Sequence, residues 1–176
     1  MADLQKYFSQ FHDAIALKRD AEIAILADKR RKVLDKLGTG IERQRKAGAI
    51  IPTYRPLNQG SYPMGTGIKP VKGDYDLDVG LLFNLDKLDY PDPLTVKMWV
   101  HDALDGHTKE VRVREPVVTV FYAEGEEHCY HLDLAVYADA CGDGSSYLGR
   151  GKEHSLPENK RWEESDPEAL LKAMRT

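Results

Sequence analysis

Apolar residues recur at helical spacing through the first part of the chain, with charged residues between them. They are Leu4, Phe8, Phe11, Ile15, Ile23, Leu26, Val33 and Leu37. Because residues three and four apart share one face of a helix, this spacing predicts a long amphipathic helix or two helices in line. Asp20 is a suitable start for a second helix, and Gly38 is a suitable C-cap. A short polar helix over 41–47 and an irregular, proline-containing segment over 50–57 are expected next.

The pattern changes to that of a strand at residue 76. Residues 76–83 alternate at first and end in an almost wholly apolar run, which predicts a central strand covered on both sides. Asp92 and Pro93 are typical N-cap and N1 residues, so a helix is expected from there to about Leu104, packed on the sheet. Residues rich in β-branched and aromatic side chains then predict further strands, with an antiparallel turn at 123–127. These strands are 111–113, 117–122 and 129–137.

The last part of the chain combines a polar segment with one more helix. Residues 141–162 are rich in Gly, Ser and charge and are interpreted as a long loop of the kind that often covers active sites. Four basic side chains in it are candidates for phosphate contacts, although solvated loop charges are the commoner outcome. They are Arg150, Lys152, Lys160 and Arg161. Asp166 and Pro167 predict a helix that runs through Leu171 and Met174.

Two aspartates in the strand 76–83 are the main candidates for chemistry. Asp76 and Asp78 are two residues apart, so both carboxylates point to one face of the strand while Leu77 and Val79 point to the other. Mg²⁺ prefers oxygen ligands and usually binds one or two carboxylates, with water and substrate phosphates completing its shell. The pair therefore has the chemistry of a site for a metal-nucleotide complex.

A third carboxylate and a glycine turn agree with this interpretation. In the strand 129–137, period-two alternation places His131 and Asp133 on the face opposite Leu132, so that Asp133 is free to join a site. Gly60 and Ser61 form a small turn 15 residues before Asp76, at the start of a loop rich in Gly and Pro. Backbone N–H groups in such a turn favour phosphate oxygens.

Composition narrows the class of protein. A chain of 176 residues with 41% hydrophobic content suits one domain with a sizeable core. The net charge of −4, with dispersed Lys and Arg, argues against strong nucleic-acid binding by bulk electrostatics. Cys129 and Cys141 form no CxxC pair, and the chain shows neither a secretory leader nor an apolar run long enough to span a membrane. We expect a cytoplasmic protein that does not bind a membrane.

Three rival motifs fit poorly. An EF-hand loop starting at Asp74 would need Gly and Glu where the chain has Val79 and Leu85. A P-loop starting at Gly60 would need Lys at Thr66. A zinc site would have to combine His and Cys side chains from two strand faces at a spacing that matches no common finger. Its members would be His128, Cys129, His131 and Cys141.

Three segments together resemble the cGAS/DncV-like nucleotidyltransferases, which are bacterial second-messenger cyclases of CBASS antiviral defence. They are QGSYPMGTGIKP at 59–70, DYDLDVGLLF at 74–83 and HLDLAVYA at 131–138. The resemblance covers about residues 55–170 and includes WEESDP at 162–167. It implies an α+β fold, the nucleotidyltransferase palm, with a mixed and mostly antiparallel sheet flanked by helices that include a long N-terminal one.

The resemblance also implies roles for particular residues. Gly60 and Ser61 would bind the triphosphate, assisted by Gln59. Asp76 and Asp78 would be the paired ligands and Asp133 the third ligand of two Mg²⁺ ions, with Mn²⁺ as an alternative. Asp74 would lie outside the metal pair. The ions would sit about 3.5 to 4 Å apart, and an acceptor ribose hydroxyl would attack the α-phosphorus of ATP, GTP or a similar nucleotide in line.

The function that follows is synthesis of a cyclic di- or trinucleotide, with regulatory protein partners as a further expectation. The alternatives are another transferase on this fold, such as a polyadenylating, tRNA-end or drug-modifying enzyme, and a nucleotide-binding sensor without transfer activity. All three carboxylates are present, which disfavours the sensor. Residues 1–176 are expected to form the catalytic core without the C-terminal helical domain of the family, so we expect the chain alone to bind metal-nucleotide weakly and to make little cyclic product.

Overall fold

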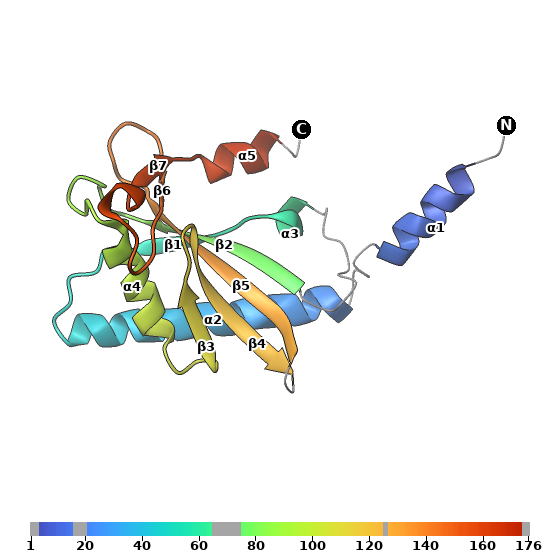
Figure 1. Cartoon of the computed structure of the whole chain (residues 1–176), viewed down its shortest axis with the longest axis horizontal. Helices are drawn as coiled ribbons and strands as arrows, with labels where there is room; N and C mark the ends of the chain where they lie inside the picture. The colour runs from blue at the N-terminus through green and yellow to red at the C-terminus, as the bar shows by residue number, and fades with distance from the viewer. Residues whose placement is uncertain (1–3, 16–20, 65–74, 125–126, 174–176) are drawn as a thin grey trace.

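The computed structural model describes residues 4–15, 21–64, 75–124 and 127–173, which are organised around one mixed β-sheet (Figure 1). Its strands are β1 (Tyr54–Asn58), β2 (Tyr75–Phe83), β3 (Glu110–Val113), β4 (Val117–Glu124), β5 (Glu127–Ala138), β6 (Tyr147–Gly149) and β7 (Trp162–Glu164). The strand order is β1-β2-β5-β4-β3, while β6 pairs with β5 and β7 pairs with β6. Among the strand pairs that the structure describes, only β2 and β5 run parallel. The expected α+β fold with a mixed, mostly antiparallel sheet is therefore confirmed.

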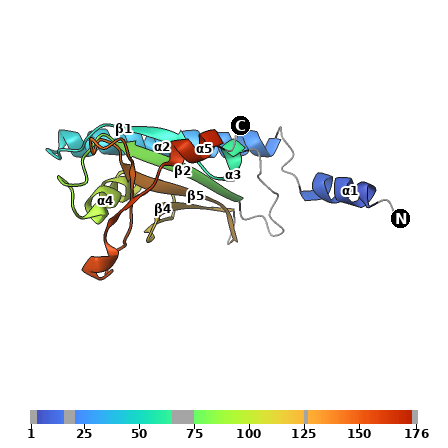
Figure 2. The ribbon, with the colours of Figure 1, turned by 90° about the horizontal axis from the view of Figure 1, so that it is seen from above.

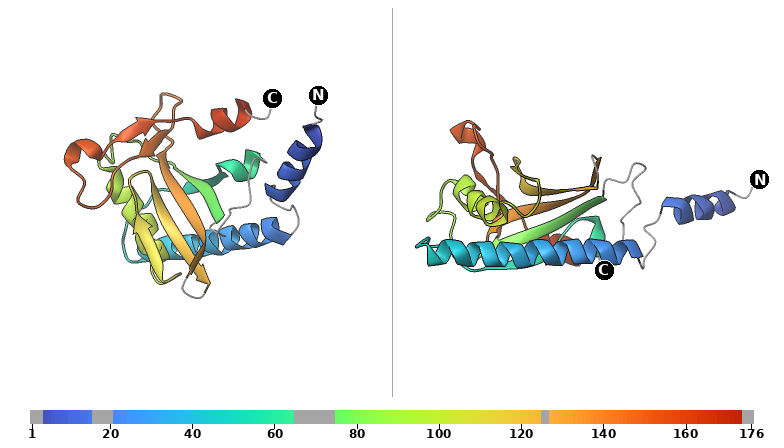
Figure 3. Two further views of the ribbon diagram at one scale, coloured as in Figure 1. Left: turned by 45° about the vertical axis from the view of Figure 1, so that its right-hand side comes forward. Right: turned by 90° about the horizontal axis from the view of Figure 1, so that it is seen from below.

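Two helices cover one face of this sheet. The helices are α1 (Gln5–Ile15), α2 (Ala21–Lys46), α3 (Ser61–Met64), α4 (Pro93–Leu104) and α5 (Pro167–Ala173), with a 3-10 turn η1 (Pro157–Asn159). Figure 2 and the right panel of Figure 3 show α2 running along the sheet, with α4 beside it, whereas α1 projects away from the sheet. Within the described ranges, no helix combines the length and the apolar character that a membrane span requires.

The hydrophobic core lies between α2, α4 and the sheet. From the helices, Val33 and Leu37 of α2 and Val96 and Val100 of α4 are fully buried. The strands contribute every second residue, because alternate side chains share a face. From β2 and β5 these are Leu77, Val79, Leu81, Phe83, Leu132, Leu134 and Val136.

The strand β2 is covered on both faces at its carboxyl end, as predicted. Leu82 points away from the helices, yet it is 2% exposed because it packs with Ala135 and Tyr137 in a second, smaller cluster. The amino end of β2 differs, since Asp76 is exposed and Asp78 is half-buried. One strand thus leads from a polar site into the core.

The predicted helix starts at Asp92 and Asp166 are confirmed. Asp92 Oδ1 accepts a hydrogen bond of 2.9 Å from the backbone N–H of Leu94, and Pro93 opens α4. Asp166 Oδ1 accepts one of 2.8 Å from Ala169 N–H at the start of α5. In each case the carboxylate satisfies a backbone donor that has no partner inside the helix.

The helix α2 does not stop at Gly38, so the predicted C-cap and the separate polar helix over 41–47 are wrong. It continues through Gly38 and Gly40 to Lys46. A Cβ built on Gly40 would overlap the backbone of Ala103 in α4, so glycine is needed there for close helix packing, not for a turn. Asp20, the expected start of this helix, lies outside the described residues.

The segment 50–57 was expected to be irregular, but it contains the strand β1, paired antiparallel with β2. Pro56 lies opposite Leu81 in this pair. Proline cannot donate a ladder hydrogen bond, so it is tolerated on an edge strand, and β1 is at the edge of the main strand order. The prediction of an irregular segment is therefore wrong for the residues of β1.

The segment 141–162 is also more ordered than a loop, because β6 lies within it and β7 begins at its end. Arg150 forms a bidentate ion pair with Glu163, at 3.0 and 3.1 Å. Arg161 also reaches Glu163, at 3.4 Å, and Lys160 lies 3.8 Å from Asp92. Three of the four basic candidates for phosphate contacts therefore have carboxylate partners of their own.

The buried side chain of Lys97 connects α4 to two segments that follow it in the chain. Lys97 is fully buried, and its ammonium donates to the carbonyl oxygens of Arg114 at 2.5 Å, Glu115 at 2.7 Å and Gly151 at 2.6 Å. Burial lowers the pKa of Lys97 to about 8. All three donors of the ammonium have acceptors, so the charge is compensated inside the protein.

Candidate functional site

The parallel pairing of β2 with β5 brings the predicted carboxylates onto one face of the sheet. In its register Asp78 lies directly opposite Asp133, and Asp76 lies directly opposite His131. Leu77 and Leu132, on the other face, are buried in the core. Two segments more than 50 residues apart therefore present four polar side chains as one cluster.

Three of these side chains are close enough to share a metal ion. One donor atom each from Asp76, His131 and Asp133 lie within 4.8 Å of one another. His131 Nε2 is 3.1 Å from Asp76 Oδ1. His131 was not among the predicted site residues. Its place on the same face as Asp133 was visible in the strand alternation, but its approach to Asp76 depends on the pairing and register of β5 with β2.

Asp78 is the carboxylate most affected by its surroundings. Burial raises its pKa to about 6, and the negative charges of Asp76 and Asp133 act in the same direction, while His131 opposes them. A bound cation would offset both causes, because its charge would stabilise the buried carboxylate and compensate for the repulsion. The crowding of carboxylates on this face thus favours a positive ion between them.

Asp133 is held in place by a buried hydroxyl. Thr119 lies opposite Asp133 in the antiparallel pair of β4 with β5 and is fully buried. Its Oγ1 donates a hydrogen bond of 2.5 Å to Asp133 Oδ1. A hydroxyl fixed in the sheet therefore restricts the orientation of the third carboxylate.

The Gly60-Ser61 turn lies beside the same cluster. Gly60 has a φ of +67°, and a Cβ on it would overlap the carboxylate of Asp78, so only glycine fits. Ser61 is exposed and opens the four-residue helix α3. The backbone N–H of Gln59 donates to the carbonyl of Asp78 at 3.1 Å, which joins the turn to β2. Residues 65–74, with the rest of the predicted phosphate loop and Asp74, lie outside the described part.

The side chain of Gln59 is turned toward the sheet. Its Nε2 donates to the hydroxyl of Tyr137 at 2.8 Å, and its amide group lies over Gly80. Gln59 thus lies next to the turn and connects it to β5.

The zinc site considered above would have used His128 and Cys129, whose side chains lie outside the described part. Another of its members, His131, lies beside Asp76.

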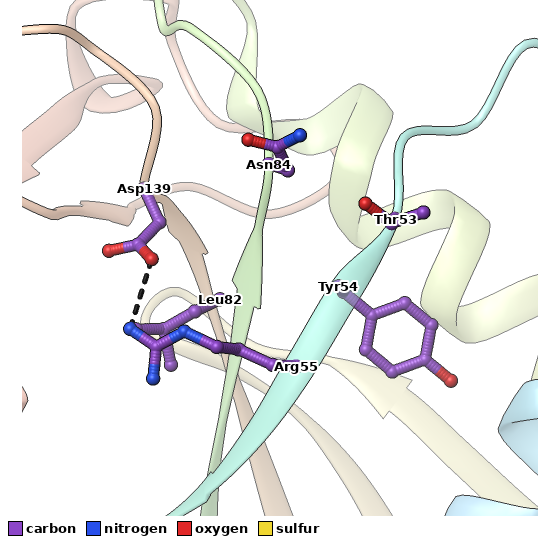
Figure 4. A pocket seen from close by; sticks show the side chains of 6 residues that line it. All are labelled: Thr53, Tyr54, Arg55, Leu82, Asn84 and Asp139. Atoms are coloured by element: carbon purple, nitrogen blue, oxygen red, sulfur yellow. Dashed lines mark hydrogen bonds and ion pairs between the residues drawn. The ribbon is translucent and has the colours of Figure 1, made fainter.

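A pocket of about 290 Å³ lies elsewhere on the molecule (Figure 4). Its lining residues are Thr53, Tyr54, Arg55, Leu82, Asn84 and Asp139. Arg55 is held there by Asp139 at 3.1 Å and by Glu168 of α5 at 2.8 and 2.9 Å. Leu82 is four residues beyond Asp78 on β2, or about 13 Å along the strand. This pocket is therefore separate from the carboxylate cluster.

Comparisons with known proteins agree with this geometry. Residues 55–137 match the family model "Cyclic GMP-AMP synthase DncV-like, nucleotidyltransferase domain". The matched range holds the Gly60-Ser61 turn and all three aspartates.

Solved structures share the fold at low sequence identity. The chain is similar to the DncV cyclic AMP-GMP synthase of Vibrio cholerae, with a TM-score of 0.71 and 14% identity over 98% of this chain and 60% of that one. For the Bradyrhizobium diazoefficiens CD-NTase CdnG in complex with GTP the TM-score is 0.72, with 16% identity over 97% of this chain and 46% of that one. For E. coli MS115-1 CdnC with ATP the TM-score is 0.61, with 16% identity over 97% of this chain and 50% of that one. The chain therefore spans about half of the length of these relatives.

The turn and the carboxylates lie within the matched residues 55–137, and nearly the whole chain shares the fold of the solved structures. These findings support a cGAS/DncV-like nucleotidyltransferase.

Proposed function

We propose that this chain is the catalytic palm of an enzyme that joins nucleoside triphosphates into a cyclic di- or trinucleotide, as a second messenger in CBASS antiviral signalling. The observation that carries the proposal is the meeting of Asp76, Asp78 and Asp133 on one sheet face beside the Gly60-Ser61 turn. Because the chain spans 46 to 60% of the structures named above, the activity is proposed for the whole protein.

The residues of the cluster fit two divalent ions, Mg²⁺ or alternatively Mn²⁺. Carboxylate oxygens are the ligands that Mg²⁺ prefers, and the pKa of Asp78 is raised by burial and by the negative charges of Asp76 and Asp133. We assign Asp76, Asp78 and Asp133 to hold the ions. When bound, such ions supply charge neutralisation for the triphosphate and make an acceptor hydroxyl more acidic.

Other residues of the chain would bind the phosphates, face the acceptor and support the turn. The backbone of the Gly60-Ser61 turn would bind phosphate oxygens, and the exposed side chain of Ser61 would be available to the nucleotide. The carboxylate of Asp133, oriented by Thr119, would face the acceptor ribose. Gln59 would support the turn through its hydrogen bond to Tyr137. Acceptor and donor must be aligned to about 3 to 3.5 Å for attack, so these fixed positions matter for rate.

The substrates we propose are ATP, GTP or similar nucleotides. This follows the relatives, which were solved with GTP, with ATP and with a linear pppApG intermediate. We also propose a cytoplasmic setting, regulatory protein partners, and no strong binding of nucleic acid or membrane. The net charge of −4 supports the absence of non-specific nucleic-acid binding.

The test is a product assay with labelled ATP, GTP, CTP and UTP, alone and mixed, in the presence of Mg²⁺ or Mn²⁺. Products are treated with phosphatase, which leaves cyclic molecules intact, and are identified by mass spectrometry. The whole protein should give a phosphatase-resistant product, and its Asp133→Asn variant should give none. Linear tailing of RNA, or transfer to a drug, would establish another transferase on this fold. Nucleotide binding without any transfer would establish the sensor.

A further inference from the structure

The carboxylate cluster contains a nitrogen donor that the proposed chemistry does not use. We propose that His131 is a ligand of the metal ion held by Asp76 and Asp133, so that this position takes a first-row divalent transition-metal ion in preference to Mg²⁺. The inference rests on the proposed function, because it concerns the metal of the same site.

The spacing of the donor atoms supports direct ligation. Two atoms that bind one ion at about 2.1 Å each are separated by no more than about 4.2 Å. His131 Nε2 and Asp76 Oδ1 are 3.1 Å apart, within this limit. The third donor, from Asp133, lies within 4.8 Å of both, so a small side-chain movement brings it to one ion with them.

The surroundings of His131 keep its ring in the site. Its side chain is 19% exposed, and its ring lies against that of Phe121, with 6.2 Å between the centroids. Phe121 is the neighbour of His131 on β4, while Asp76 is its neighbour on β2. The imidazole is therefore packed between two strands on the same face as the carboxylates.

The same geometry separates the two proposed ions by ligand type. Asp76, His131 and Asp133 form a mixed set of oxygen and nitrogen donors. Asp78 lies next to the Gly60 turn, where carboxylate and phosphate oxygens would be the donors. Mg²⁺ suits oxygen donors, whereas imidazole binds first-row transition metals well. We therefore place the transition metal at the mixed set and expect Mg²⁺ with the triphosphate beside Asp78.

Mn²⁺ is the appropriate probe because it is paramagnetic, so a nitrogen ligand is detected by its magnetic coupling to the ion. The test is demanding because Mn²⁺ binds most weakly of the first-row divalent metals. The chain, labelled with ¹⁵N-histidine or left unlabelled, is titrated with Mn²⁺ alone and followed by electron paramagnetic resonance. Pulsed spectra should show a nitrogen coupling that changes with the isotope. In His131→Gln the coupling should be lost, and the affinity for Mn²⁺ should fall about tenfold or more, with a smaller change for Mg²⁺.

His101→Gln is the matched control, because it makes the same change on α4, where His101 contacts Asp102 and no residue of the site. Both nitrogen coupling and Mn²⁺ affinity should be unchanged in it. Thermal unfolding followed by circular dichroism checks that His131→Gln is folded, and His131→Asn is a second variant with the same expected loss of coupling.

Bound Mn²⁺ without nitrogen coupling in the unsubstituted chain would overturn the inference, as would a coupling that persists in folded His131→Gln. Either result would leave the proposed function intact. Conversely, a nitrogen-coupled Mn²⁺ in a whole protein that makes no cyclic product would overturn the proposed function and leave His131 as a ligand.

Discussion

Gly60 lies against the carboxylate of Asp78 so closely that a methyl group on Gly60 would overlap Asp78 Oδ2. The contact joins the turn proposed to bind phosphate to a carboxylate proposed to bind metal. Because Gly60 also has a φ of +67°, both its backbone conformation and its missing side chain are required at this position. The two parts of the site therefore depend on each other's position.

Replacing Gly60 by alanine should weaken the binding of Mg-ATP at least tenfold, because either the turn or the Asp78 carboxylate must move. Calorimetric titration measures the affinity, and urea unfolding measures the stability. Gly106→Ala is the control, since Gly106 has a φ of +71° but an open space around the position of a Cβ. Both variants should lose about 1 kcal/mol of stability from the left-handed conformation, whereas only Gly60→Ala should lose affinity. Equal affinities in the two variants would show that the contact is unimportant.

Asp76→Asn and Asp78→Asn should each remove most metal-dependent nucleotide binding, because each change replaces a charged oxygen ligand by a neutral amide. Calorimetry with ATP, with and without Mg²⁺, is the measurement. Asp89→Asn is a suitable control, since Asp89 is exposed between β2 and α4. Undiminished affinity in both site variants would rule these residues out as the metal pair.

Asp133→Asn should act differently, because this residue is proposed to serve the acceptor. Donor binding should change less than about tenfold, whereas transfer by the whole protein should fall at least about a hundredfold. Binding is measured with ATP and Mg²⁺, and transfer by release of pyrophosphate. Normal turnover in this variant would show that Asp133 is not the third carboxylate.

The raised pKa of Asp78 predicts how binding depends on pH. The carboxyl must lose its proton to bind a cation, and its pKa is raised from 3.8 to about 6 by burial and by the charges of Asp76 and Asp133. Affinity for Mg²⁺ should therefore be constant above pH 7 and should fall on the order of tenfold per pH unit well below 6. Titrations between pH 5 and about 7.5 test this. A flat profile over that range would contradict the assignment.

The raised pKa of Asp78 also predicts that the stability of the metal-free protein depends on pH. Between 3.8 and about 6 the Asp78 carboxyl is protonated in the folded protein and ionised in the unfolded chain. The folded state then binds more protons, so the contribution of this group to stability falls as pH rises through that range. Asp78→Asn should remove this part of the pH dependence, which is measured by urea unfolding at several pH values.

Lys97→Met should destabilise the protein by about 3 kcal/mol, because it leaves three backbone carbonyls without their buried donor. These are the carbonyls of Arg114, Glu115 and Gly151. The free energy of unfolding in urea is the measurement. Lys109→Met, at an exposed position, should change it by less than about 0.5 kcal/mol. Similar values for the two variants would show that the buried contacts contribute little.

Local patterns were sufficient to predict the elements that carry the aspartates. Alternation placed Asp76, Asp78 and Asp133 on faces opposite buried Leu77, Val79 and Leu132, and the structure confirms those faces. The helix from Pro93 to Leu104 was equally readable, because its N-cap is a local hydrogen bond. Such features depend on neighbours in sequence, which a single chain displays directly.

Features that depend on distant partners were missed. Gly38 was predicted to end a helix, but α2 continues through it and Gly40 packs against Ala103 of α4. Pro56 argues against a strand until β1 is known to lie at an edge. His131 joins the cluster only through the parallel register that places it opposite Asp76. Neither strand carries a local signal for that register.

The position of β1 and β2 in the sheet has a consequence for motion. Asp76 and Asp78 lie on the part of β2 that pairs with β5, so their separation from Asp133 changes only if this central strand pair opens. Gly60 follows β1, which has one neighbour in the main strand order and frays at lower cost. Amide hydrogens of β2 and β5 should therefore exchange with solvent far more slowly than those of β1. The three aspartates are therefore held more rigidly than the Gly60-Ser61 turn. If the proposed function is correct, we expect nucleotide to enter and leave by movement of the turn away from Asp78 and not by movement of the aspartates.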